Sequence, residues 1–285
     1  MPSIDQYAEY LSRLPISPHT RRAYLGRVKA YLAWLETVPE GSRALCDDVE
    51  AALLVREYKQ HLLLSGSTSN SVNAILCALD NLHLFLGLGR TRAKRQALPQ
   101  LAPRALTSEE LRRFLKAVAQ TKCIRDRTIA MLMLNCGLRI SEVAALNVSD
   151  VLLSARKRVL IVRCSKNDKH REIPINRDCG EALQQYLSSE KRADAEAPLF
   201  LSRKGNRLSM PAIDRIIRAF GRDSGVELSS HSLRHTCLSQ LVRAGVDLVT
   251  VAEIGGHSRL ETTRRYTLPS PDVMAEAMER LNQAS

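Results

Sequence analysis

The chain has 285 residues, of which 42 are Lys or Arg and 30 are Asp or Glu, so its net charge is +12 and its length suggests two domains. Hydrophobic residues make up 45% and charged residues 25%, which excludes a disordered basic tail. The longest purely apolar run, at 129–134, is far shorter than the roughly 20 residues of a membrane span, and residues 1–10 lack the pattern of a secretory signal. We therefore expect a soluble cytoplasmic protein without a membrane partner.

The positive charge is unevenly distributed along the chain. Residues 1–89 hold eight Lys or Arg and nine Asp or Glu, residues 90–108 hold five basic residues and no acid, and residues 109–285 carry the remaining +8. Such a balance indicates a polyanionic partner, most often nucleic acid, although some proteins are basic for solubility alone. Aromatic residues, at 4%, are too few for base-stacking platforms, which favours phosphate contacts to a duplex.

The first third of the chain has the pattern of packed helices. Ser17 is placed to cap a helix with Pro18 at its first position. Arg22 and Lys29 project from the side opposite to its apolar stripe, with Gly26 between them, a flat basic face that suits a phosphate backbone but also fits a solvated helix. The stripe consists of Tyr24, Val28, Tyr31, Leu32 and Leu35.

Further helices and a linker complete this part of the chain. Residues 67–70 predict the cap of a second clear helix, and a weaker helix is predicted at about 49–64. From Gly87 to Pro103 the chain loses its apolar periodicity and gains glycine, proline and basic residues, which is typical of a linker. We therefore place a helical domain at 1–88 and a basic interdomain linker at 89–104.

The second domain is predicted to be mainly α with a small antiparallel sheet. The capping pattern at 107–110 begins a helix, and a strongly apolar helix covers 124–135. Two β-branched runs, at 158–163 and 171–175, flank a polar stretch and predict a hairpin. From Met210 onward the pattern is helical again.

Cysteines and histidines give no sign of a metal site. The seven cysteines are an odd number without a C-x-x-C pair, so neither a disulfide framework nor a cysteine zinc site is expected. His231 and His235 have the spacing of a helical zinc pair, but the segment HSLRH lacks the Glu of H-E-x-x-H.

Four cationic residues are candidates for binding a phosphate. Arg139 follows a glycine break, His231 and Arg234 are three apart and share a helix face, and His257 follows two glycines. Two arginines and two histidines suit a phosphate clamp, because a guanidinium matches two phosphate oxygens. Taken singly, each residue also fits a solvated or packing role, so the spacing predicts a phosphate site without deciding whether it is catalytic.

Two segments extend this pattern. The stretches LMLNCGLRISEVAALNVSDV and HSLRHTCLSQLVRAGVDLVTVAEIGGHSRLETTRRYT resemble the two signature boxes of the tyrosine recombinases, the phage-integrase and Xer-type family. The resemblance covers the whole chain and implies a two-domain clamp around DNA. Residues 1–88 are similar to the helical SAM-like core-binding domain and 105–269 to the α+β catalytic domain, while 270–285 is similar to a C-terminal helix exchanged between protomers.

The resemblance also implies six catalytic residues. They are Arg139, Lys166, His231, Arg234, His257 and Tyr266. Tyr266 is expected to attack the scissile phosphate and form a 3′-phosphotyrosyl intermediate, while Arg139 and Arg234 hold the non-bridging oxygens. Lys166 is expected to protonate the departing 5′-hydroxyl, with Lys169 as the competing candidate.

The two histidines and one acid complete the implied site. His231 is expected to hydrogen-bond the phosphate and assist proton transfer, and His257 to orient the phosphate and the nucleophile. Glu142 resembles the supporting acidic position of the family. No metal, nucleotide or other cofactor is expected, because the phosphotyrosine bond conserves the energy of the broken strand.

The implied partners are a duplex DNA with a specific recombination site and further copies of the chain. A homo-tetramer is expected in the synaptic complex, with an accessory DNA-bending protein or a second recombinase as a further partner. The apolar stripe at 274–281 also fits a helix packed on its own domain. The expected DNA-contacting residues are Arg22, Lys29, Arg90, Arg92, Lys94 and Arg95.

Some alternatives stay open at this point. A non-cutting DNA-binding protein of the same fold and a type IB topoisomerase-like enzyme share parts of the pattern. The chain has Gly255 where the family commonly has Leu, and Leu268 where it often has His. Because only 16 residues precede the first predicted helix, we expect no separate arm-binding domain, which favours Xer-like or transposon-resolving systems over large phage integrases.

Overall fold

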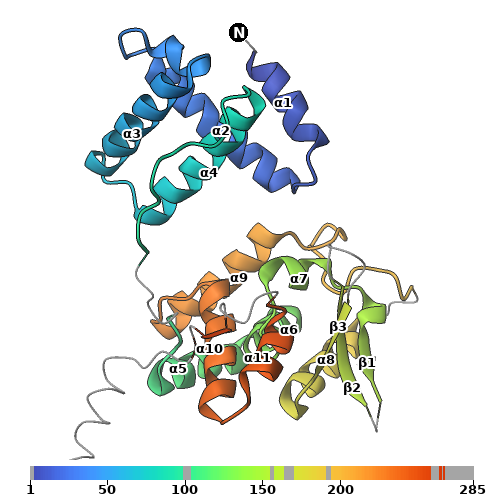
Figure 1. Cartoon of the computed structure of the whole chain (residues 1–285). Coiled ribbons are helices and arrows are strands. Elements are labelled where there is room, and N and C mark those ends of the chain that lie inside the picture. Colours follow the sequence, from blue (N-terminus) through green and yellow to red (C-terminus); the bar gives the residue numbers. More distant parts are fainter. Residues whose placement is uncertain are drawn as a thin grey trace, which may run out of the picture. The chain divides into compact units, whose positions relative to one another are not determined.

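The computed structural model describes residues 3–98, 104–154, 157–163, 170–190, 194–257, 263, 264 and 266. The described chain is mostly helical with a small three-stranded antiparallel sheet, which confirms the predicted fold class (Figure 1). The chain divides into two compact units, 1–99 and 100–285, and the division falls within the predicted linker. In the described residues, every helix is too short or too polar to cross a membrane.

The first unit is built from helices only. Both predicted caps are present: the Ser17 side chain accepts a hydrogen bond from the Thr20 amide, and the Thr68 side chain accepts one from the Ser71 amide at the start of the last helix. The first helix was not predicted; it is short and fully buries only Tyr7 and Leu11. The elements are α1 (Ile4–Arg13), α2 (Pro18–Leu35), the 3-10 helix η1 (Gly41–Leu45), α3 (Asp48–Leu64) and α4 (Ser69–Phe85).

The amphipathic pattern predicted for α2 is confirmed. Its stripe packs into the core of the unit, with Val28 and Tyr31 completely buried. Arg22 and Lys29 are exposed on the other side, and a Cβ added at Gly26 would meet nothing within 4 Å. The helix thus presents a shallow basic face to solvent.

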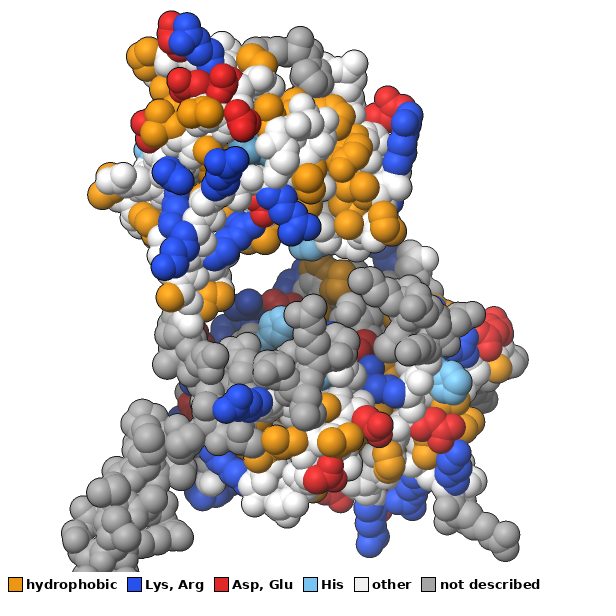
Figure 2. Space-filling view, viewed as in Figure 1, with side chains coloured by type: hydrophobic (Ala, Val, Ile, Leu, Met, Phe, Trp, Pro, Cys, Tyr) orange, Lys and Arg blue, Asp and Glu red, His pale blue; other side chains and the backbone are white. Residues whose placement is uncertain are grey.

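Residues 90–96 differ from the predicted free linker, because α4 binds them. The Asp80 carboxylate forms an ion pair with Arg95, and the Asn73 side chain accepts from the Gln96 amide at 2.7 Å and donates to its carbonyl oxygen at 2.9 Å. Asn73 and Asp80 are seven residues apart, so they lie on one face of α4 and hold the following segment against it. Figure 2 shows Lys and Arg side chains gathered where α4 and this segment lie.

The second unit combines helices with the sheet. The strands are ordered β1-β2-β3, and β2 pairs antiparallel with β3 from Val159↔Pro174 to Arg163↔His170, which confirms the predicted pairing. Lys166 and Lys169, in the connection between them, lie outside the described residues. The elements are α5 (Ser108–Gln120), α6 (Ile124–Cys136), α7 (Ile140–Ala145), η2 (Val148–Asp150), β1 (Val151–Leu153), β2 (Arg158–Arg163), β3 (His170–Pro174), α8 (Arg177–Ser189), α9 (Met210–Ser224), α10 (Ser230–Arg243) and α11 (Leu248–Gly255).

Helix α6 is the centre of this unit. It is apolar on most of its sides, as expected of a buried helix, and it packs against α8 and α10. Gly137 ends it in the left-handed conformation, with φ of +59°. The chain therefore turns sharply just before Arg139. The predicted C-terminal helix, 270–285, lies outside the described residues.

Candidate active site

Arg139 is fixed by the turn between α6 and α7. It is the residue before the first turn of α7, and the Glu142 carboxylate accepts from its backbone amide at 2.8 Å and from its guanidinium at 2.8 Å. The same carboxylate thus caps the helix and orients the arginine. Arg139 also donates from Nη2 to the carbonyl oxygen of Gly256 at 2.8 Å.

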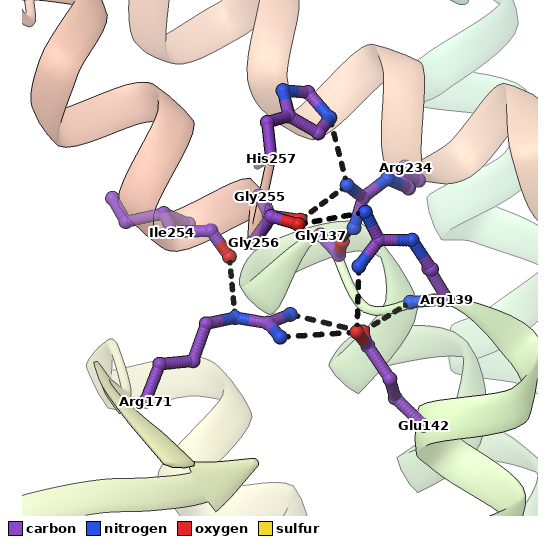
Figure 3. A network of polar contacts seen from close by, with 9 residues as sticks. All are labelled: Gly137, Arg139, Glu142, Arg171, Arg234, Ile254, Gly255, Gly256 and His257. Carbon is purple, nitrogen blue, oxygen red and sulfur yellow. Dashed lines mark hydrogen bonds and ion pairs between the residues drawn. The ribbon is translucent and has the colours of Figure 1, made fainter. Parts of the chain in front are cut away.

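Arg234 reaches the same place from α10. It is 4% exposed and donates through Nη1 to the carbonyl oxygen of Gly137 and through Nη2 to that of Gly255 (Figure 3). These carbonyl groups lie at the ends of α6 and α11, where helices leave acceptors unsatisfied. Burial, and then the charge of Arg139, lower the pKa of Arg234 to about 10, so it remains a cation at neutral pH.

Arg171, on β3, ties the two arginine-bearing regions together. Its guanidinium forms two hydrogen bonds with the Glu142 carboxylate, at 3.0 and 2.9 Å, and its Nε donates to the Ile254 carbonyl oxygen at 3.1 Å. A Cβ added at Gly256, where φ is +60°, would lie 2.6 Å from Arg171 Nη1, so any other residue would strain the backbone and displace the Arg171 guanidinium. Burial would raise the pKa of Glu142, but hydrogen bonds and charge from Arg171, with those from Arg139, outweigh it and lower that pKa.

His257 is held in one neutral tautomer by its two partners. A guanidinium has no acceptor, so His257 Nε2 accepts from Arg234 Nη2 at 2.9 Å, and Nδ1 donates to the Thr263 hydroxyl at 2.8 Å. Burial, followed by the charges of Arg234 and Arg139, lowers the pKa of His257 to about 4. The imidazole is therefore uncharged at neutral pH.

Tyr266 is positioned by the same short turn. Its amide donates to the Thr263 carbonyl oxygen at 2.9 Å, and its ring stacks on that of His257 with centroids 6.1 Å apart and an interplanar angle of 6°. The Tyr266 hydroxyl lies 2.7 Å from Nδ1 of His235, which directly follows Arg234 on α10. A phenol, three guanidinium groups and two imidazoles therefore share one site.

Most of the predicted site residues are brought together. Arg139, Arg234 and His257 form one network, and Tyr266 stacks on its edge. His231 is exposed one turn before His235, with the two ring centroids 6.3 Å apart. The other predicted member, Lys166, belongs to the undescribed hairpin connection.

Sequence reasoning missed three residues of the site. Arg171 was assigned only to a strand, Thr263 was not singled out, and His235 was considered only as half of a zinc pair. The available signals were a cation inside a β-branched run and the i, i+4 spacing of His235 from His231. Neither signal identifies a partner, because the contacts come from distant segments.

Family models match both units of the chain. The model described as Phage integrase family matches residues 104–272, and the Phage integrase, N-terminal SAM-like domain matches residues 4–88. The chain belongs to the phage integrase family of tyrosine recombinases. Within it, the chain is 32% identical over 282 residues to Tyrosine recombinase XerA of Thermococcus kodakarensis, covering 97% of this chain and 94% of that one. It is 30% identical to Tyrosine recombinase XerC of Pseudomonas fluorescens, covering 93% and 90%.

Solved structures share this fold. The chain is similar to the XerH site-specific recombinase bound to difH substrate in a pre-cleavage complex, with a TM-score of 0.72, 20% identity and coverage of 97% of this chain and 84% of that one. The chain is also similar to a lambda integrase(75–356) dimer bound to a COC' core site, with a TM-score of 0.69, 17% identity and coverage of 92% of this chain and 93% of that one. With the sequence relationship, the chain is an enzyme, a tyrosine site-specific recombinase acting on DNA, and the non-cutting alternative is not favoured.

Proposed function

We propose that Tyr266 cleaves one DNA strand by attacking the scissile phosphorus, and that the 3′-phosphotyrosyl bond is later attacked by a 5′-hydroxyl to rejoin a strand. The observation that carries this proposal is the convergence of Tyr266 with Arg139, Arg234 and His257. These residues come from three separate segments, and hydrogen bonds and the stacking of Tyr266 on His257 bring them together.

The two arginines would bind the non-bridging phosphate oxygens. Their positive charge would stabilise the transition state, in which negative charge accumulates on those oxygens. Arg139 and Arg234 are held by carbonyl groups, and Glu142 is shared with Arg171. The guanidinium groups are therefore oriented before DNA arrives, which favours catalysis because little reorganisation remains. His257 would orient the phosphate through Arg234, from which its Nε2 accepts, and the nucleophile through its stacked ring.

Proton transfer to the leaving group is assigned to the hairpin and to α10. Lys166 would protonate the departing 5′-oxygen, with Lys169 as the competing candidate and His231 assisting. Support comes from the strand that follows the hairpin connection, because Arg171 on β3 is bound to Glu142 and thereby to the site. His231 precedes Arg234 by one helical turn and is exposed to an incoming strand.

DNA binding and assembly form the wider part of the proposal. The exposed α2 face and the exposed cations of the segment after α4 would contact phosphates of a specific recombination site. We further propose a homo-tetramer in the synaptic complex, with residues 270–285 exchanged between protomers and an accessory DNA-bending protein or second recombinase in some reactions. The protein would act in the cytoplasm, where its DNA substrate lies. The proposed phosphate contacts are Arg22, Lys29, Arg90, Arg92 and Lys94, whereas the ion pair with Asp80 engages Arg95.

The test uses a DNA duplex that is first selected in vitro for binding to the full chain and is then nicked next to the cleavage position. Cleavage next to the nick releases a short oligonucleotide, so the covalent protein–DNA adduct accumulates and is counted on a denaturing gel. Tyr266→Phe is expected to form no adduct while binding the duplex normally. Arg139→Ala or Arg234→Ala is expected to lower adduct formation by about 10²–10³-fold, the effect of removing one donor from a charge-stabilising site.

Two outcomes would contradict the proposal. Adduct formation by Tyr266→Phe would refute the assignment of Tyr266 as the nucleophile. Adduct formation by Arg139→Ala at the wild-type rate would refute the role of Arg139 in binding the phosphate. Strand exchange between two labelled duplexes separates recombination from topoisomerase-like relaxation. Deletion of 270–285 is expected to abolish synapsis and leave duplex binding intact, so unchanged recombination by that variant would refute the exchanged helix.

A further inference from the structure

The hydroxyl group of Tyr266 has a basic partner that the assigned roles do not use. Nδ1 of His235 lies 2.7 Å from this oxygen, and the two rings are in contact with centroids 5.6 Å apart. The distance is within the range in which a side chain removes a proton directly. His235 is half-buried, and its position on α10 is fixed one residue after the buried Arg234.

The other histidine beside Tyr266 is already engaged. His257 stacks on the tyrosine ring, but its Nε2 accepts from Arg234 and its Nδ1 donates to Thr263. It could take the phenolic proton only by giving up one of these bonds. The geometry therefore gives His257 the orientation of the ring and leaves the hydroxyl to His235.

The reaction needs such a partner because a phenol is a weak nucleophile at neutral pH. The unperturbed pKa of a tyrosine is about 10, so the hydroxyl must lose its proton as it attacks. Neighbouring arginines stabilise the phenolate, but a guanidinium carries no acceptor and takes no proton. An imidazole at hydrogen-bond distance, in the tautomer that leaves Nδ1 unprotonated, supplies the proton acceptor that the arginines lack.

We propose that His235 is the general base for Tyr266, an inference that rests on the proposed function. As the Tyr266 oxygen forms its bond to phosphorus, its proton passes to His235 Nδ1. The bond from phosphorus to the 5′-oxygen breaks, and that oxygen takes a proton from the donor on the leaving-group side. In rejoining, the 5′-hydroxyl attacks phosphorus and gives its proton back to that donor, the bond from phosphorus to the Tyr266 oxygen breaks, and His235 returns its proton to the phenolate.

Helix α10 gives this arrangement its precision. Positions 231, 234 and 235 are three and four residues apart, so they share one face of the helix. The phosphate-binding arginine and the base are therefore carried by one rigid element. The spacing between His235 and the phosphate-binding Arg234 is then set by the helix.

The test compares His235→Asn with the wild-type full chain in single-turnover cleavage of the nicked duplex. The Asn oxygen stands near the position of Nδ1 and accepts the hydrogen bond, but it takes no proton. A second substrate carries sulfur in place of the departing 5′-oxygen, which removes the need for an acid. We expect His235→Asn to cleave both substrates about 10²–10⁴-fold more slowly and to recover as the pH rises, because hydroxide then ionises the phenol.

Controls separate this inference from its alternatives. His61→Gln, an exposed histidine on α3, is expected to cleave at the wild-type rate. A rate for His235→Asn within threefold of wild type would show that the imidazole only positions Tyr266, and a defect removed by the sulfur substrate would assign it to the leaving group. Either result overturns the proposal. His235→Gln is the second variant if His235→Asn does not bind the duplex, and Tyr266→Phe reports on the nucleophile independently.

Discussion

Replacing Arg171 with Met is expected to destabilise the catalytic unit and leave the helical unit unchanged. The substitution removes both hydrogen bonds to Glu142, whose side chain is 10% exposed, and the bond to the Ile254 carbonyl oxygen. Removing one partner of a buried ion pair costs about 3–5 kcal/mol. Because Arg139 still neutralises Glu142, we expect the lower end, about 3 kcal/mol, or a fall of about 6–12 °C in the melting temperature of a unit of this size.

The chain supplies its own internal control for this measurement. Its single tryptophan, Trp34, lies on α2, so tryptophan fluorescence reports unfolding of the helical unit alone. Calorimetry or circular dichroism reports both units. In Arg171→Met the fluorescence transition should stay in place while a second transition moves down. A shift of the Trp34 transition by the same amount, or a second transition that stays at its wild-type temperature, would refute this assignment of the ion pair.

The pH dependence gives an independent check on the same pair. The folded-state pKa of Glu142 is lowered, so its stabilising contribution is present above its unfolded value of about 4.3 and is lost as the pH falls through the folded value. The difference in unfolding free energy between wild type and Arg171→Met should therefore become smaller in acid. In a double-mutant cycle, the variant that carries both Glu142→Gln and Arg171→Met should lose less unfolding free energy than the two single variants lose together.

Three further predictions concern the site and the residues proposed to contact DNA. Burial and the charge of Arg234 lower the pKa of His257 to about 4, so its imidazole should show no NMR titration between about pH 5.5 and 8. A titration midpoint near pH 6.5 would contradict the buried contact. Gly255→Leu adds a carbon 3.3 Å from the His257 ring, so urea unfolding should show a loss of about 1–3 kcal/mol, and adduct formation should slow; wild-type behaviour in both would refute the crowding. Arg92→Gln should reduce the slope of log affinity against log salt by about 0.9, whereas Arg95→Gln should change it less and instead speed trypsin cleavage at Lys94; equal slopes would place both arginines on DNA.

The elements that could be predicted are those whose signals are local. Caps at Ser17 and Thr68 and the apolar stripes behind them depend only on neighbours in sequence. Helix α8 was not predicted, because Gly180 interrupts its pattern. In the structure Arg158 fills the space beside Gly180, with its Cδ 3.2 Å from where a Cβ would be. That compensation comes from β2 and is invisible in a local window.

The site divides in the same way. The positions of Arg139 and Arg234 were predicted because each lies in a recognisable local pattern. The partners of these arginines were not, since they are backbone carbonyl groups of Gly137, Gly255 and Gly256, which have no side chain to mark them. The docking of residues 90–96 on α4 was missed for a related reason, because Asn73 and Asp80 are ordinary helix-surface residues in sequence.

The use of helix-end carbonyl groups to hold the arginines has a consequence for how this enzyme tolerates mutation. A carbonyl oxygen cannot be deleted by changing a side chain, and it carries only partial charge, so it would leave most of the charge of Arg234 for the proposed phosphate. Sensitivity instead falls on the backbone shape at Gly137 and Gly256, where φ is +59° and +60°. A scan that replaces every residue with alanine should find its most damaging positions in this site partly at residues that have no functional group at all.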